Sequence, residues 1–251
     1  MHSPDQASFG FLSSQPEPLR YDYASPDPGD VPARLASLIS TSGRVLDVGC
    51  GTGSLTRFIQ ERTGACVIGI EPDAERSKFA RNSGLNVLHG YLDAEFLREN
   101  GPFDTIVFAD VLEHLPDPGS VIQLARTGLS PGGAIVASVP NVAHWFVRTD
   151  LMRGRFRYRE CGIMDATHLR WFTRESLHSF FANLGFVVDK HLYTVNSHMS
   201  EYQEAAPWRW MSAHARSRVI GALVKIGPNL FGCQHVVRAF PLQLQAVSLG
   251  P

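Results

Sequence analysis

Short apolar runs alternate with amphipathic stretches along most of the chain. The spacing of apolar positions predicts helices over 31–40, 55–63, 74–83, 121–128 and 173–184. Strands buried on both faces appear as nearly continuous apolar runs. Such runs occupy 44–48, 66–70, 86–89, 103–109, 134–139, 186–195 and 234–243. The alternation predicts an α/β fold whose mostly parallel sheet is covered by helices on both faces.

Three stretches interrupt this alternation. Residues 1–30 are polar and rich in proline, so we expect a flexible lead-in there, or a lid that places Tyr21 and Tyr23 over a ligand. Residues 141–172 lack a clean period, and 196–232 are expected to be helical in parts. We interpret 31–251 as a single domain with insertions at about 141–172 and 196–232, over the carboxyl ends of the strands.

Length, charge and cysteine content narrow the class of protein. A chain of 251 residues suits one domain with a sizeable core. A formal net charge of −1 provides no overall attraction for nucleic acid, so no such partner is expected. The four cysteines form no CxxC pair, which is typical of free thiols in a reducing compartment. No apolar run approaches the roughly 20 residues of a membrane span, and we expect a cytoplasmic protein.

The strongest motif follows the first expected strand. The sequence Val-Leu-Asp-Val-Gly-Cys-Gly-Thr-Gly at 45–53 leads from that strand into a helix, as a nucleotide-binding glycine loop does. Its glycines let the backbone turn tightly and approach a ligand closely. Asp47 lies just before the first glycine, where a carboxylate would repel a pyrophosphate. The motif therefore favours a ligand that carries a cationic ammonium group.

Several short segments after the glycine loop follow one another in an order that is informative about the protein family. Glu71 ends the second expected strand, where an acidic residue can accept both hydroxyls of a ribose. Later come Phe-Asp-Thr-Ile-Val at 103–107, Asp-Val-Leu-Glu-His-Leu at 110–115, Leu-Ser-Pro-Gly-Gly at 129–133 and Ser-Val-Pro-Asn at 138–141. With these segments, residues 40–195 resemble the class I S-adenosylmethionine-dependent methyltransferases, in particular small-molecule enzymes of bacterial glycan and secondary-metabolite pathways.

The resemblance implies a Rossmann-like sheet of seven strands in the order 3-2-1-4-5-7-6, in which the last strand of the chain, strand 7, is antiparallel. It also implies S-adenosylmethionine as the cofactor, with its ribose on Glu71 and its adenine amino group on Asp93. His114 would contact the cofactor or only cap the junction between strand and loop. The cofactor-binding residues implied in this way are Asp47, Gly49, Cys50, Gly51, Glu71, Pro72, Asp93, Asp110 and Val111.

The chain departs from the family pattern at one point of the expected adenine site. Gly90-Tyr91 stands where relatives often have Gly-Asp. Either Tyr91 stacks on the adenine, or Asp93 contacts it alone.

Two histidines of the first insertion are candidates for the catalytic base. The run Asp-Ala-Thr-His-Leu-Arg-Trp-Phe-Thr at 165–173 resembles a segment of many small-molecule methyltransferases. His168 would remove a proton from a hydroxyl or amine, since the ordinary pKa of histidine, about 6.5, suits this role. His144 is the competing base. In the structural alternative, Asp165, Thr167 and Arg170 only hold the insertion on the core. No metal is expected.

The first insertion also supplies candidates for binding the methyl acceptor. Its arginines at 153, 155, 157 and 159 alternate with other residues, so an extended segment would present them on one face. That face is either solvated and salt-bridged, or it binds an acidic group of the acceptor. The candidate acceptor contacts are Tyr21, Trp145, Arg148, Tyr158, Asp165 and Arg170.

These features together predict methyl transfer to an oxygen or nitrogen of a small molecule, in secondary-metabolite or glycan biosynthesis. The alternatives are an RNA or protein methyltransferase and, from another class, a noncatalytic S-adenosylmethionine-binding regulator or scaffold. The apolar stretch 219–226 is expected to face the core, with a dimer partner or a membrane surface as alternatives. Both a monomer and a homodimer are compatible with the sequence.

Overall fold

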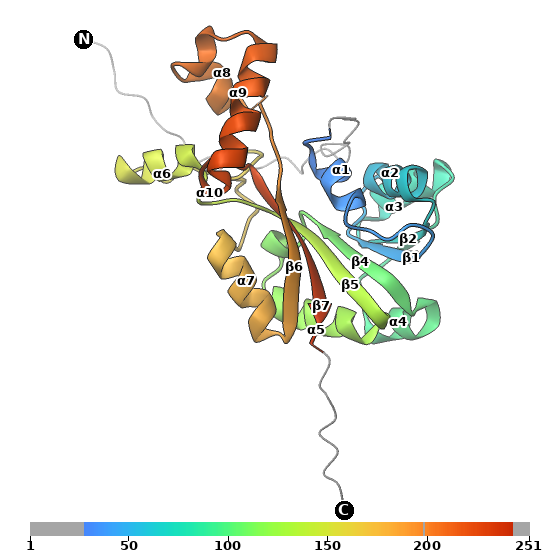
Figure 1. The fold of residues 1–251 in the computed structure, drawn as a ribbon. Helices are drawn as coiled ribbons and strands as arrows, with labels where there is room; N and C mark the ends of the chain where they lie inside the picture. The colour runs from blue at the N-terminus through green and yellow to red at the C-terminus, as the bar shows by residue number, and fades with distance from the viewer. Residues whose placement is uncertain (1–27, 198, 243–251) are drawn as a thin grey trace, which may run out of the picture.

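The sheet predicted from the apolar runs is present in a computed structural model, which describes residues 28–197 and 199–242. Its strands lie in the order β3-β2-β1-β4-β5-β7-β6, and β7 runs antiparallel to both of its neighbours (Figure 1). The predicted fold class and strand order are confirmed. The strands are β1 (Arg44–Val48), β2 (Cys66–Glu71), β3 (Val87–His89), β4 (Phe103–Ala109), β5 (Leu129–Pro140), β6 (Phe186–Tyr193) and β7 (Gln234–Pro241).

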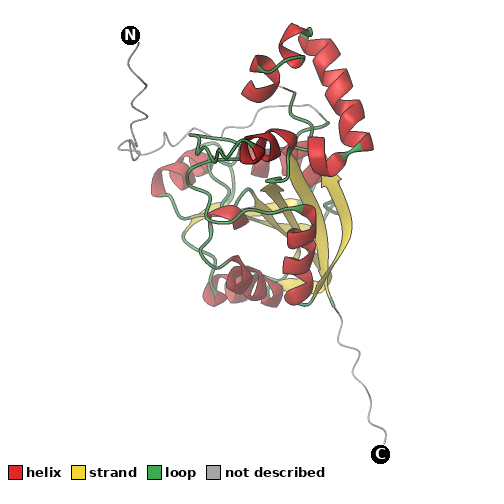
Figure 2. Cartoon of the chain, turned by 90° about the vertical axis from the view of Figure 1, so that its left-hand side faces the viewer, coloured by secondary structure: helices red, strands yellow, loops and turns green. Residues whose placement is uncertain are grey.

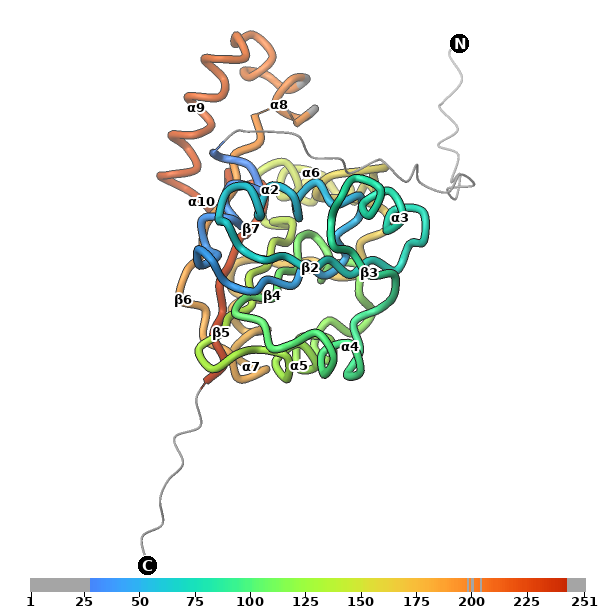
Figure 3. The backbone as a smooth tube through the Cα atoms, turned by 90° about the vertical axis from the view of Figure 1, so that its right-hand side faces the viewer, coloured from blue at the N-terminus to red at the C-terminus, as the bar shows by residue number. Residues whose placement is uncertain are grey.

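Helices cover both faces of this sheet. One face carries α1 (Val31–Ala36), α2 (Ser54–Thr63) and α3 (Ala74–Asn82). The other face carries α4 (Ala94–Asn100), α5 (Pro118–Thr127) and α7 (Arg174–Asn183) (Figure 3). The carboxyl ends of the parallel strands therefore lie at an edge of the sheet between the two helical layers. Ligands bind at this edge in sheets of this kind.

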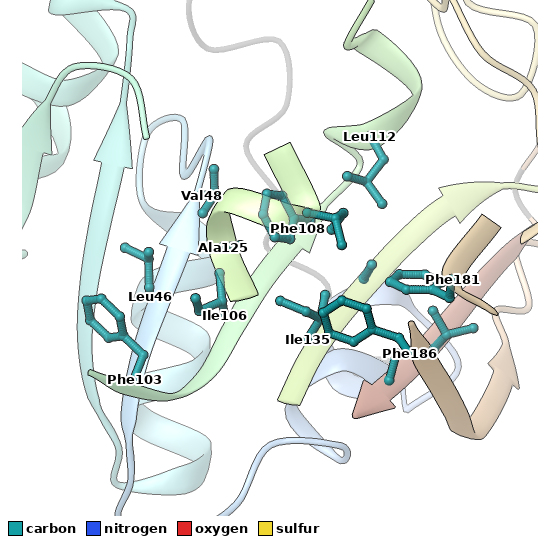
Figure 4. Close-up of a cluster of buried hydrophobic side chains, with 14 of the residues drawn as sticks. Leu46, Val48, Phe103, Ile106, Phe108, Leu112, Ala125, Ile135, Phe181 and Phe186 are labelled. Carbon is teal, nitrogen blue, oxygen red and sulfur yellow. The ribbon is translucent and has the colours of Figure 1, made fainter. Parts of the chain in front are cut away.

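Alternating strand residues pack into two separate hydrophobic cores, one on each face of the sheet, because successive side chains of a strand point to opposite faces. Val45 packs with Leu35 of α1 and Ile59 of α2. Its neighbour Leu46 packs on the opposite face with residues of α4, α5 and α7. Figure 4 shows this second and larger core, which includes Phe103, Ile106, Phe108, Ile135, Phe181 and Phe186.

Within the sheet and its helical layers, two elements differ most from the sequence prediction. Helix α4 was not expected, because it has seven residues and buries only Phe96 and Leu97, too few for a periodic signal. Strand β5 begins at Leu129 rather than at Ala134, so the Ser-Pro-Gly-Gly segment is not a turn that precedes the strand. The pairing with β4 shifts between Leu129 and Ala134, which places this segment in a bulge of the strand.

The two insertions pack on each other and form one unit, which we call the cap module (residues 141–172 and 196–232). Its helices are α6 (Trp145–Met152), α8 (Ser200–Glu204), α9 (Ala213–Ile226) and α10 (Pro228–Phe231), with the 3-10 helix η2 (Trp208–Trp210). The Trp145 ring lies 5.6 Å from that of Tyr202 and 6.5 Å from that of Trp208. Helices α8 and α9 project beyond the sheet (Figures 1 and 2). Within the described ranges, no helix is long and apolar enough to cross a membrane.

Candidate active site

A cavity of about 640 Å³ opens at the carboxyl ends of the central strands. This volume lies within the range of about 300–1,000 Å³ that is usual for small-molecule sites. The wall combines the start of α1, the glycine loop after β1, the loop after β4, and both insertions. The lining residues fall within 30–32, 47–55, 109–114, 162–168, 194–196 and 233–234, with Arg76 and Pro140.

The glycine loop forms the floor of this cavity. Gly49 has a φ of +70° and must be small, because an added Cβ would lie 2.9 Å from the Cγ2 atom of Val111. Gly51 has a φ of +56°, and no atom lies within 4 Å of the place where its Cβ would be. Cys50 between them is buried, and burial raises the pKa of its thiol. The loop thus brings bare backbone to the cavity, as the sequence predicts.

Asp47 is a buried carboxyl with spare hydrogen-bonding capacity. It is 1% exposed, and its Oδ2 accepts a hydrogen bond of 2.7 Å from the Thr56 hydroxyl. Its Oδ1 is buried and has no partner among the described residues. Burial raises its pKa to about 7, and the nearby Glu71 adds to this effect. An unpaired buried carboxylate favours a cationic ligand.

Glu71 lies behind the glycine loop rather than on the cavity wall. Its Oε2 accepts a hydrogen bond of 2.8 Å from the Gly51 backbone, and its Oε1 accepts one of 2.9 Å from the Asp73 backbone. These bonds fix the carboxylate at the end of β2. Each oxygen keeps a further lone pair, so both can still accept a hydroxyl.

Further residues expected near the cofactor also lie outside the cavity lining. The Asp93 Oδ1 caps α4 and accepts a hydrogen bond of 2.7 Å from the Phe96 backbone. Pro72 is exposed, and its carbonyl accepts a bond of 3.0 Å from Nε2 of His89. Tyr91 is 79% exposed. Asp93 therefore has a structural role as a helix cap, which differs from the adenine contact that the resemblance implies.

Asp110 links three strands at the cavity wall. It has a φ of +53°, which is unusual for a residue with a side chain. Its Oδ1 accepts hydrogen bonds from the Ser138 hydroxyl at 2.7 Å and from Nε2 of Gln234 at 2.9 Å. Its neighbour Val111 contacts the loop at Gly49 instead of the cavity. The Asp110 carboxyl is buried, and burial raises its pKa.

His168 occupies the cavity wall next to His114. Their ring centroids lie 4.8 Å apart, and His168 is only 7% exposed. Its Nδ1 lies 3.2 Å from the carbonyl of Ile163 and must donate to it, which leaves the lone pair on Nε2. Burial lowers the pKa of this imidazole. His168 is therefore neutral near pH 7 and able to accept a proton.

Glu113 completes this part of the wall. It is 1% exposed, and neither carboxylate oxygen has a hydrogen-bond partner among the described residues. Burial raises its pKa well above the ordinary value, and Asp110 adds to the effect. The ligand atoms of Glu113, His114 and His168 lie within 4.8 Å of one another. One carboxylate and two imidazoles can relay a proton, and the same donors can hold a divalent cation.

His144, the competing base, lies outside the cavity lining. It is fully buried in the cap module, with Nε2 at 3.1 Å from the Tyr202 hydroxyl. Burial lowers its pKa to about 3. Its surroundings are aromatic, since it packs against Trp145, Phe146 and Tyr202.

The segment around His168 also holds the first insertion on the sheet. Asp165 lines the cavity, and its Oδ1 accepts bonds from the backbone and the hydroxyl of Thr167. The Arg170 side chain donates to the Pro116 carbonyl, and its backbone N–H donates to the backbone carbonyl of Glu113 at 3.0 Å. Arg170 therefore holds the insertion in place, as the structural alternative predicts, and it does not line the cavity.

The other acceptor-binding candidates are not brought together. Trp145 packs inside the cap module, and Arg148 donates to the Ala143 carbonyl at 2.6 Å. Tyr158 is 58% exposed and packs against Trp171. Tyr21, like Tyr23, lies outside the described residues. Asp165 alone among the described candidates lines the cavity.

The alternating arginines do not form one extended face. Helix α6 ends just before Arg153, and residues 153–158 after it form no strand. Arg159 turns inward, where its guanidinium pairs with Glu201 at 2.6 Å and lies over the Phe146 ring. Arg159 is therefore salt-bridged, as one of the two predicted alternatives states. Only the tertiary structure could show this, because the carboxylate comes from α8 in the second insertion.

The cavity suits the cofactor that the sequence resemblance implies. Three buried acidic side chains line it, those of Asp47, Glu113 and Asp165, and Arg76 is the one arginine or lysine in the lining that the described residues provide. A sulfonium with an ammonium group is a cation that such a wall attracts. Asp47 and Gly51 would hold its methionine part, and Glu71 its ribose. Glu113, Arg76 and Gln234 are not among the predicted site residues, although Glu113 lies inside the motif at 110–115.

Comparison with known proteins places these features in context. Residues 20–191 match a family described as "Methyltransferase domain". The chain is 40% identical over 104 residues to a ubiquinone biosynthesis O-methyltransferase of Pseudomonas fluorescens strain Pf0-1, a match covering 39% of this chain and 44% of that protein. It is 33% identical over 178 residues to the protein of that name from Xylella fastidiosa strain M23, covering 64% and 67%. The first match thus spans under half of the relative's length.

Solved structures share the fold at low sequence identity. One is a SAM-dependent methyltransferase from Archaeoglobus fulgidus, with a TM-score of 0.56, 22% identity, and coverage of 82% of this chain and 89% of that one. Another is magnesium protoporphyrin IX methyltransferase from Synechocystis PCC 6803 with bound SAH, with a TM-score of 0.51, 14% identity, and coverage of 80% and 75%. At these identities the likeness concerns the fold.

Proposed function

This chain belongs to the S-adenosylmethionine-dependent methyltransferases, and we propose that it transfers the methyl group to a hydroxyl oxygen of a small molecule. One observation carries the proposal. A single cavity holds the unpaired carboxylate oxygen of Asp47 at one end and the neutral imidazole of His168 at another part of its wall. The first suits the cation of the cofactor, and the second suits the acceptor's proton.

Oxygen is proposed as the methylated atom on two grounds. The relatives described above are named O-methyltransferases. A base is needed more for a hydroxyl than for an amine, because a neutral hydroxyl is a weak nucleophile until its proton leaves. Acceptors of the ubiquinone type follow from the relatives' names, whereas a glycan or secondary metabolite follows from the sequence motifs. An acceptor screen should therefore contain phenols, catechols and sugars.

The protein's own groups would act through position and proton transfer. When bound, the cofactor supplies a methyl group on a positively charged sulfur. This sulfur is a good leaving group because it departs as a neutral thioether. Nε2 of His168 accepts the proton of the acceptor hydroxyl. Glu113 lies beside it, and the raised pKa of its carboxyl suits it to take part in relaying this proton. The cap module closes the cavity on the acceptor side, which orients the acceptor and limits water.

Product formation tests the proposal directly. Protein is incubated with S-adenosylmethionine and the acceptor screen, and both S-adenosylhomocysteine and the methylated acceptor are measured. We expect both products with at least one hydroxyl acceptor and neither with the Asp47→Ala variant. Calorimetric binding of the cofactor without product from any acceptor would favour the noncatalytic role instead. The same assay is run on cell extract with and without nuclease treatment. Methyl transfer to RNA that nuclease treatment removes, or methyl transfer to protein, with no small-molecule product, would contradict the proposed acceptor class.

A further inference from the structure

The cap module carries a charge opposite to that of the rest of the chain. Its two insertions contain ten arginine and lysine residues and five acidic residues, a formal charge of +5. The whole chain carries −1, so the remainder carries −6. The stretch 205–241 contains no aspartate or glutamate at all. A module so polarised presents a positive field to one side of the molecule, which favours an anionic partner.

Exposed apolar side chains gather on the same module. The described residues include 13 large hydrophobic side chains that are exposed, and eight of them lie in the cap module. The most exposed of these are Ile226 at 84%, Met152 at 80% and Trp210 at 70%. The module makes up only about a third of the described chain, so this is an enrichment. Exposed apolar side chains interspersed with basic ones are typical of interaction surfaces.

Helix α9 shows both properties on one helix. Its inner face consists of Arg216, Ile220 and Val224, which are buried. Its outer face carries Arg218, Val219, Lys225 and Ile226, all exposed. A helix of 14 residues with basic and aliphatic side chains toward solvent has the composition of helices that lie in a membrane interface. The projection of α9 beyond the sheet leaves this face open (Figures 1 and 2).

A second stretch of the module repeats this composition. All eight residues of 151–158 are exposed, and they include Arg153, Arg155 and Arg157 but no acidic residue. The structure gives no ion pair to these three arginines within its described ranges. The Phe156 ring lies 5.8 Å from that of the half-buried Trp171, which holds the stretch against the end of the first insertion. The arginines therefore remain available for an anionic surface.

We propose that the cap module docks peripherally on an anionic lipid surface, with Arg218 and Lys225 at the phosphates and Trp210 and Ile226 in the interfacial layer. Nucleic acid fits less well, because exposed aliphatic side chains such as Ile226 and Met152 contribute nothing to phosphate contacts. A second copy of the chain also fits less well, since a two-fold contact would press this basic face against itself. Docking would hold the cavity, which the same insertions line, beside the lipid surface.

Vesicle flotation of the full chain tests this proposal independently of any methyl transfer. The vesicles contain phosphatidylcholine alone or phosphatidylcholine with a quarter of phosphatidylglycerol, at 50 mM and 500 mM NaCl. We expect binding to the anionic vesicles at 50 mM salt that is at least tenfold stronger than to the neutral ones. Most of this binding should be lost at 500 mM salt, because salt screens exposed charges.

Variants assign the binding to the module. A basic residue near an anionic surface strengthens binding about fivefold, so Arg218→Glu with Lys225→Glu should weaken it at least 25-fold. Lys78→Glu with Arg81→Glu on exposed α3 makes the same change in charge and should leave binding intact. Trp210→Ser with Ile226→Ser should weaken binding at both salt concentrations. Melting temperature and affinity for S-adenosylhomocysteine verify that each variant is folded.

Several outcomes would overturn the proposal. Equal binding to neutral and anionic vesicles, or equal loss in the α3 control, would show that the module's charge is not responsible. Unchanged binding in both the α9 variant and an Arg153→Glu, Arg155→Glu, Arg157→Glu variant would do the same. A wild-type dimer that the α9 variant dissociates, with no vesicle binding, would assign the face to a second copy. Tighter binding to an RNA oligonucleotide than to vesicles would assign it to nucleic acid.

Discussion

Asp47 shows how one buried side chain can set the ligand preference of a site. A carboxyl removed from water prefers to be neutral, and its pKa near 7 follows from that preference. A raised pKa in the folded state means that the folded chain holds this proton more tightly than the unfolded chain. Stability therefore falls as pH rises from the ordinary value of 3.8 toward 7. A cationic ligand reverses the preference because it stabilises the carboxylate.

We expect affinity for S-adenosylhomocysteine to depend on pH through Asp47. Below about pH 7 the ligand must displace a proton from Asp47 of the free protein. Kd should therefore rise about tenfold for each unit by which the pH is lowered below 7, and it should be constant above pH 7. Calorimetry between pH 5 and 9 measures this. Asp47→Asn should bind weakly with no such slope, whereas Glu95→Gln, an exposed change of the same charge, should behave as wild type. A wild-type affinity that is flat with pH would contradict the role of Asp47.

His168 is expected to act as the base, and its replacement separates chemistry from structure. His168→Ala should lower kcat by about 10²- to 10⁴-fold with little change in cofactor affinity or melting temperature. The acid limb of the wild-type pH–rate profile should lie below 6.5, because burial lowers the pKa of this imidazole. The matched variant His144→Ala should lose stability yet keep its rate per folded molecule.

The same experiment distinguishes a base from a cation site. Assays with and without EDTA should give equal rates when His168 removes the proton itself. Loss of rate in EDTA that Mg²⁺ or Mn²⁺ restores would assign Glu113, His114 and His168 to a divalent cation instead. A normal rate of His168→Ala with a lowered melting temperature would favour the purely structural role of this segment.

At the scale of elements, short helices depend on their end residues rather than on periodicity. Helix α4 has seven residues, and the Asp93 carboxylate satisfies one of its free backbone N–H groups. The sequence resemblance instead places this carboxylate on the cofactor's adenine. Both roles need an oxygen at the same position, but they differ in what depends on it.

We expect Asp93→Ala to lower the free energy of unfolding by about 1 kcal/mol and to leave affinity for S-adenosylhomocysteine within twofold. Asp93→Ser should restore most of the stability, because serine also caps helices well. Denaturant unfolding and calorimetry on the three proteins measure the two quantities. Stability restored in Asp93→Ser together with a large loss of affinity in both variants would instead support the adenine contact.

The insertions show that an element can lack a sequence signal and still be ordered. Helix α6 lies inside the stretch that has no clean period, and its Trp145 is covered by Tyr202 and Trp208 from the other insertion. Neither insertion buries its aromatic residues alone. Because the two segments are separated by α7 and β6 in the chain, only the tertiary structure could reveal their common core.

At the scale of the whole molecule, the cavity joins segments from α1 to β7. A ligand there stabilises the folded chain and not the unfolded one. S-Adenosylhomocysteine at 100 times its Kd contributes about 2.7 kcal/mol, which for a domain of this size raises Tm by roughly 5–10 °C. Thermal unfolding followed by circular dichroism should show this shift in wild type and none in Asp47→Ala. An unchanged Tm at that saturation would contradict binding to the native fold.

The sequence by itself determined the sheet, its helical layers, and the positions of the glycine loop, Asp47 and Glu71. These features are local, since a strand's apolar run and a glycine's positive φ are encoded within a few residues. The tertiary structure decided which distant groups meet. It placed Glu113 beside His168, buried His144 away from the cavity, and paired Arg159 with Glu201. Proximity between remote segments depends on how the insertions pack, and no local pattern records that packing.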